Sequence, residues 1–252
     1  MHSMLRAGAL CAFVVAGAAA SPPAGSAADA VPSIVVQASR TYAAAVKGTL
    51  GMQRHFTTVV VGGPVRHTEE SDSGYLARDG VFVKIAYSRI VRDGKTFDRT
   101  ALDKRNAQTN TDWSNGKVFF KEPYDPRFMA DYTFESPAAC AACAAGTLAV
   151  HFSSAVADAQ HGDGTMWIDA DAHVVKLTYA PNALPPHAAS GTVTETGGPA
   201  LADAWYVTKI DEAYGGRVLF VKGTGTFVGT FDHFKRFASA AEGLKALDDG
   251  SL

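Results

Sequence analysis

The sequence predicts a mainly β protein with a few helices, in which a single curved antiparallel sheet forms an incomplete barrel covered by helices. Three observations carry this prediction. The hydrophobic period changes from helical to strand-like after residue 48, Gly- and Asp-containing turns separate the apolar segments, and strands follow closely on one another near the C-terminus. An antiparallel sheet of this length has to curl, close or be covered on one face.

The first 28 residues have the pattern of a secretory signal peptide. Arg6 precedes an apolar stretch over residues 7–20, which is too short for a membrane-spanning helix. Small residues then offer cleavage sites after Ala20 or Ala28, and an uncleaved anchor is the alternative. We expect a periplasmic or secreted protein with no transmembrane segment in the mature chain.

Composition limits the partners and the number of domains. The net charge is −2 and the chain has no basic run, so nucleic acid is a poor partner. With 47% hydrophobic residues the chain can form a full core. We expect one domain over residues 33–237, followed by a short C-terminal helix and tail over residues 238–252.

The domain begins with a predicted helix. Ser33 is a suitable N-cap, apolar residues recur every four positions over residues 34–46, and Gly48 ends the helix. Strand-like alternation follows over residues 49–61, and Asp79-Gly80 predicts a tight hairpin turn.

The middle and the end of the chain are more varied. Residues 99–116 are polar and predict a short helix or loop, and two prolines make residues 122–127 irregular. Residues 165–169 and 173–179 predict a β-hairpin. The expected meander that follows consists of strands at 191–196, 205–211, 217–222 and 224–234, separated by Gly-rich turns.

Removal of the signal peptide leaves two cysteines. Cys140 and Cys143 most simply form one disulfide in an oxidising compartment. Their spacing also fits a redox-active pair, and a metal site is a third alternative.

The aromatic residues in the predicted strands, together with the alternation of apolar and polar positions, predict where an apolar ligand would bind. The residues expected to line the concave face of the sheet are Leu50, Met52, Phe56, Val83, Ile85, Tyr87, Trp167 and Trp205. An ordinary filled core requires the same alternation of apolar residues, so the sequence is compatible with either a core or a cavity at these positions.

Motifs for catalysis are weak. The chain has neither a nucleophile elbow nor a zinc-binding His-Glu-x-x-His helix, so we predict a protein that is not an enzyme and has no cofactor or metal. The alternative is a metal-dependent enzyme centred on His151, His161 and Asp163. Asp169 and Asp171 are placed to flank a cation, but a solvated hairpin turn is the simpler interpretation.

The chain resembles the periplasmic lipoprotein carriers of the Lol type, as a divergent member. The resemblance depends on the leading helix 33–47, the run 48–61, and the Gly-apolar-Asp segment 164–169 followed by the apolar strand 174–177. It implies an incomplete barrel that holds acyl chains, with a lipid or a lipidated protein as partner. A cell-envelope module that recruits proteins at its sheet edge is a further alternative.

Overall fold

The computed structural model describes residues 31–116, 120–184, 187–218 and 221–252. The predicted signal peptide, residues 1–28, lies outside the described residues. Within the described part, no helix is both long and apolar enough to cross a bilayer.

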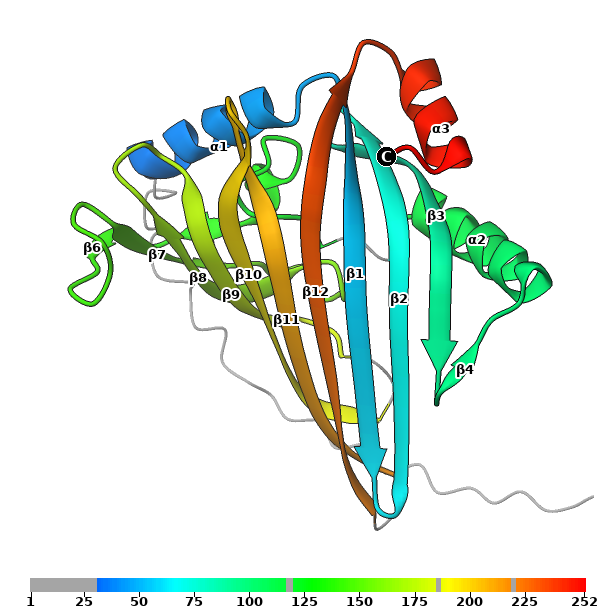
Figure 1. Ribbon diagram of the computed structural model, residues 1–252. Coiled ribbons are helices and arrows are strands. Elements are labelled where there is room, and N and C mark those ends of the chain that lie inside the picture. Colours follow the sequence, from blue (N-terminus) through cyan, green and yellow to red (C-terminus); the bar gives the residue numbers. More distant parts are fainter. Residues whose placement is uncertain (1–30, 117–119, 185–186, 219–220) are drawn as a thin grey trace, which may run out of the picture.

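One large antiparallel sheet dominates the molecule (Figure 1). Its strands are β1 (Thr49–Gly62), β2 (Val65–Arg78), β3 (Val81–Arg92), β4 (Lys95–Thr96), β5 (Thr133–Phe134), β6 (Ala138–Ala139), β7 (Leu148–Ser153), β8 (Gly162–Ile168), β9 (Val174–Pro181), β10 (Ala188–Leu201), β11 (Ala204–Val218) and β12 (Val221–Phe237). Their order is β4-β3-β2-β1-β12-β11-β10-β9-β8-β7-β5, with β6 paired to β7. The sheet is curved and does not close into a barrel, which confirms the predicted fold class.

Tight turns connect the strands where the sequence predicts them. Asp79 and Gly80 both have positive φ, of 50° and 74°, between β2 and β3. An Asp-Gly pair adopts this conformation readily, and its twist matches that of the two strands. The predicted hairpin at 165–179 is also confirmed, as β8 and β9. The predicted strand 217–222 is wrong, because β11 continues through Gly215 and Gly216 to residue 218.

Within the described residues, three α-helices accompany the sheet: α1 (Ser33–Ala45), α2 (Arg99–Ser114) and α3 (Ala240–Asp249). A short 3-10 helix, η1 (Met129–Asp131), precedes β5. The helix α1 buries Val35 and Ala38 against β7 to β10, in a cluster that also contains Tyr124 and Phe152. This cluster defines the inner face of the sheet, which continues over β1 and β2 through Met52 and Tyr75.

The C-terminal helix α3 covers the opposite, outer face of the sheet. Its Leu247 packs on Leu76, which alternates with the inner-face residue Tyr75 along β2. Ser239 is the N-cap of this helix: its Oγ accepts from Glu242 N at 3.2 Å, and the Glu242 carboxylate accepts from Ala238 N, just before the cap, at 3.0 Å.

The polar helix α2 packs beside the exposed edge of β3. Asn110 Oδ1 accepts from Ile85 N at 2.9 Å, and Asn110 Nδ2 donates to Ile85 O at 2.8 Å. Asn106 Oδ1 accepts from Tyr87 N at 2.7 Å. Two asparagine side chains therefore replace a neighbouring strand at this edge, which explains a helix without an apolar stripe.

Candidate functional site

The inner face contains a cavity of about 350 Å³. A second cavity of about 340 Å³ adjoins it toward the β2–β3 turn and shares several of its walls. These volumes are in the range of small-molecule binding sites, roughly 300–1,000 Å³. The aromatic and apolar walls of the larger cavity include Met52, Phe56, Tyr75, Trp113, Phe120, Tyr179, Val193, Tyr206, Ile210, Phe227 and Phe231.

Packed aromatic rings form the wall made by β1 and β12. Phe56 stacks on Phe227 at a centroid distance of 4.7 Å and meets Phe231 edge-on at 5.7 Å. Gly229 lies directly opposite Phe56 on β12, and a Cβ atom there would come within 1.8 Å of the Phe56 ring. The glycine therefore provides the space that the ring occupies.

The segment at residues 120–127 borders the two cavities on the other side. Phe120 stacks on Tyr179 at 3.6 Å, with the rings nearly parallel. The fully buried Asp125 accepts hydrogen bonds from the Arg127 guanidinium, which also donates to Gly80 O at 3.1 Å. This ion pair connects the segment to the β2–β3 turn and so fixes one wall of the site.

Arg54 lies inside the aromatic cavity with 6% of its surface exposed. Its guanidinium carbon is 4.3 Å from the ring centre of Phe56, 4.8 Å from that of Trp113 and 5.5 Å from that of Tyr75. Among the described residues, Arg54 Nε and Nη1 have no hydrogen-bond partner. Burial lowers the pKa of Arg54 to about 10, so the side chain is still charged at neutral pH.

Three carboxyl groups line other parts of the same cavity. Burial raises the pKa of Glu122 to about 7. Burial, together with repulsion from Glu122 and Glu212, raises the pKa of Glu195 well above its ordinary value. Burial also raises the pKa of Glu212. Glu195 Oε2 lacks a hydrogen-bond partner within the described part of the chain. A neutral carboxylic acid can remain in such a place, whereas an ionised carboxylate is strongly disfavoured.

Several sequence-predicted site residues lie on the inner face. Met52 and Phe56 line the cavity, and Leu50 is buried in the cluster beside Met52. Ile85 and Tyr87 lie opposite inner-face residues of β2, where their backbone is bound by α2.

Val83 and Trp167 lie elsewhere. Val83 is the extra residue of a β-bulge in β3, which reverses the expected alternation, and it packs with Leu76 on the outer face. Trp167 alternates with the buried Met166 along β8, and Lys176 Nζ lies 4.8 Å from the centre of its ring. Their predicted place on the concave face is therefore corrected.

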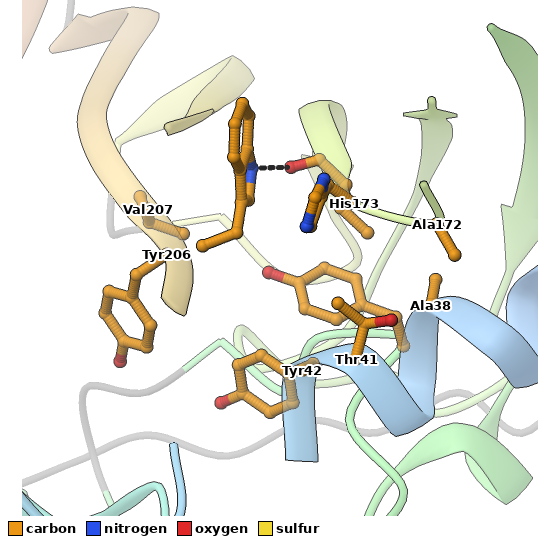
Figure 2. Close-up of a pocket in the computed structure, with 10 residues that line it drawn as sticks. Ala38, Thr41, Tyr42, Ala172, His173, Tyr206 and Val207 are labelled. Carbon is orange, nitrogen blue, oxygen red and sulfur yellow. Dashed lines mark hydrogen bonds between the residues drawn. The ribbon is translucent and has the colours of Figure 1, made fainter. Parts of the chain in front are cut away.

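Trp205 belongs to a separate, small pocket of about 30 Å³ beneath α1 (Figure 2). The indole donates to Val174 O at 3.2 Å and stacks on His173 at 4.7 Å. Ala38 and Thr41 of α1 face Tyr206 and Val207 across this pocket. The volume is about that of one water molecule, so the pocket is too small for a lipid.

The residues of the alternative enzyme site are not brought together. His161 is buried, with Nδ1 at 2.7 Å from Asp158 and Nε2 at 3.2 Å from Asp131, so both ring nitrogens are occupied. His151 is exposed beside Thr165, and the Asp163 carboxylate accepts from a backbone amide. Among the described residues, the group with metal-ligand spacing is Asp169, Asp171 and His173 in the β8–β9 turn.

The cysteine pair is a disulfide. Cys140 and Cys143 are bonded in the exposed loop between β6 and β7, with their Cα atoms 5.3 Å apart. This confirms the simplest of the three sequence-based interpretations.

Two important cavity residues were not predicted. Arg54 follows the same alternation as Leu50, Met52 and Phe56, so the strand pattern already places a charge on an apolar face. Trp113 comes from the polar helix α2, whose sequence gives no periodic signal of an inner face.

No protein-family model matches the chain, and no curated protein matches it. Two solved structures are similar in part. The first is a DUF1329 family protein from Desulfovibrio piger, with 10% identity, a TM-score of 0.39, and coverage of 82% of this chain and 93% of the other. The second is a putative outer membrane lipoprotein-sorting protein domain from Vibrio parahaemolyticus, with 8% identity, a TM-score of 0.37, and coverage of 86% and 97%. Both are partial similarities of fold.

Proposed function

We propose that this chain is a periplasmic or secreted binding protein that holds a hydrophobic ligand in the cavity on the inner face of its sheet. The observation that carries the proposal is the aromatic cavity of about 350 Å³ between β1, β2, β11, β12 and the segment at residues 120–122. Burial of apolar ligand surface there would supply about 25 cal/mol per Å². The ligand class is an acyl chain, a lipid or a lipidated protein.

Three further features support this function. The rings of Phe56, Phe227 and Phe231 give a preformed apolar wall, and Met52 adds an adaptable side chain. The predicted signal peptide and the Cys140–Cys143 disulfide both suit an oxidising compartment outside the cytoplasm. The edge of β3 is already bound by α2 at Ile85 and Tyr87, so strand addition at these residues would have to displace a helix.

The first test examines the protein as the cell makes it. The mature protein is purified from the periplasm, weighed by native mass spectrometry and then extracted with organic solvent. A co-purifying acyl species supports the proposal. A stoichiometric metal that is lost in His161→Ala would instead support the alternative enzyme, and a protein partner retained without lipid would support an interaction module.

A second test locates the ligand, with the neutral fluorophore N-phenyl-1-naphthylamine as the probe. Phe56→Asp puts a charge into the aromatic wall and is expected to weaken probe binding about tenfold or more. Val228→Asp is the matched control, because Val228 is 39% exposed and alternates with the cavity residue Phe227 along β12. A Phe56→Asp protein with native circular dichroism and native probe affinity would exclude this cavity as the ligand site.

A further inference from the structure

Arg54 is the one cationic side chain among the described residues that line the larger cavity. It is more than nine-tenths buried, and two of its nitrogens have no hydrogen-bond partner in the described structure. The faces of aromatic rings surround the guanidinium. These faces attract its positive charge, but they do not accept the hydrogen bonds that its N–H groups direct into the guanidinium plane. The Nε and Nη1 donors of Arg54 are therefore enclosed and unpaired within the described part of the ligand-free chain.

The cavity carboxyl groups do not neutralise Arg54. Within the described structure, neither Nε nor Nη1 of Arg54 is hydrogen-bonded to a cavity carboxyl group. Glu122 instead responds to Asp125 and Arg127, and Glu195 responds to the other two glutamates.

A second unpartnered polar group lies beside Arg54. Ser73 is directly opposite Arg54 in the β1–β2 ladder, so the two side chains share the inner face. The Ser73 hydroxyl is buried and, like Arg54, has no hydrogen-bond partner among the described residues. Ser73 is not among the residues that line the larger cavity, so the Arg54 guanidinium is the charged donor group there that suits a carboxylate or phosphate oxygen.

We propose that the ligand is an amphiphile with one anionic head group, bound by Arg54, while its apolar tail lies along the aromatic cavity. This inference rests on the function proposed above and specifies its ligand class. The head group is a carboxylate or a phosphate, which share the chemistry that a guanidinium recognises. Glu122, Glu195 and Glu212 carry no positive charge, so Arg54 is the described lining residue that attracts an anion by its charge.

The test compares ligands of equal tail length and different heads. Dodecanoate, dodecyl phosphate and dodecanol each displace N-phenyl-1-naphthylamine from the native protein, below their micelle concentrations. A charge-assisted hydrogen bond favours the anions, so at least one anion is expected to bind about tenfold more tightly than dodecanol. The tighter of the two anions identifies the head group.

Variants then assign the preference to Arg54. Arg54→Met is expected to weaken binding of the preferred anion about tenfold while dodecanol binding stays within about threefold, and Arg54→Lys is expected to retain part of the preference. Arg40→Met, at an exposed position of α1, is the control and should behave as the native protein. If Arg54→Met does not fold, the head-group preferences of the Arg54→Lys variant and of the native protein still test the proposal.

The outcomes separate this inference from the proposed function. Equal affinity of the native protein for dodecanol and both anions, or an unchanged preference in Arg54→Met, overturns the anionic head group and leaves the apolar cavity in place. Failure of the naphthylamine and of all three dodecyl compounds to bind overturns both. Preference for an anion that depends on Arg54 supports both.

Discussion

Among single residues, Arg54 is a buried charge whose place in the cavity costs stability. The lowering of its pKa from 12.5 to about 10 corresponds to about 3 kcal/mol against the charged form. The surrounding rings therefore compensate only part of the lost hydration. A residue under this penalty is better explained by what it binds than by what it stabilises.

We predict that Arg54→Met makes the ligand-free protein more stable. Removal of an unpaired buried charge, with a side chain of similar length filling the space, is expected to raise the free energy of unfolding by about 1–3 kcal/mol. Urea denaturation of delipidated protein measures this change, and Arg40→Met should change it by no more than about 0.5 kcal/mol. A clear loss of stability in Arg54→Met would mean that the guanidinium has a structural role.

The positions of individual residues also show how much of the cavity the sequence could predict. Alternation along β1 correctly places Met52 and Phe56 on the inner face, and it would have placed Arg54 there too. Val83 was assigned to the wrong face, because a bulge adds a residue to β3 and no local signal marks it. Trp113 enters the cavity from a helix whose position is decided by two asparagines.

At the scale of elements, α2 is the least expected part of the fold. Its N-cap Asp98 accepts from Ala101 N at 2.8 Å, which gives a recognisable helix start. Its contacts with the edge of β3 come from the polar Asn106 and Asn110, so hydrophobic periodicity could not predict where the helix packs. The hairpin turns, by contrast, depend on local backbone conformation, and their Asp-Gly pairs predict them directly.

We predict that Asn110→Ala frees the edge of β3. The Ile85 amide and carbonyl lose their partner, which is expected to cost about 1–3 kcal/mol. Hydrogen exchange at Ile85 should accelerate, and sedimentation should detect self-association through the open edge. The exposed Lys104→Ala on the same helix is the control, and native exchange at Ile85 in Asn110→Ala would contradict the assigned role.

At the scale of the whole molecule, the titrating groups set an acidic optimum of stability. Burial raises the pKa values of Glu122, Glu195 and Glu212 above the ordinary 4.5, so the folded protein binds more protons than the unfolded chain above that pH. The stability that these groups contribute is present below pH 4.5 and is lost as the pH rises, through about 7 for Glu122. Asp72 and Asp158 have lowered pKa values, so their contribution is lost below about 3.8.

We therefore predict greater stability near pH 5 than near pH 8. Each buried glutamate contributes a slope of up to about 1.4 kcal/mol per pH unit within its window. Urea denaturation across this range measures the slope, and a Glu122→Gln, Glu195→Gln double variant should reduce it. The exposed Glu135→Gln should leave the slope unchanged. A flat profile in the native protein would mean that these carboxyl groups are solvated.

The pairing of β1 with β12 has a consequence for the order in which the molecule assembles. Thr49 pairs with Phe237 and Phe56 pairs with Gly229, so the wall of the cavity joins segments from opposite ends of the domain. Contacts this distant in sequence form slowly, because a long loop must close before they contribute. A chain still emerging from a ribosome or a translocation pore has β1 without its partner and hence no cavity. The aromatic wall of the cavity is therefore complete only after the residues of β12 have emerged and paired with β1.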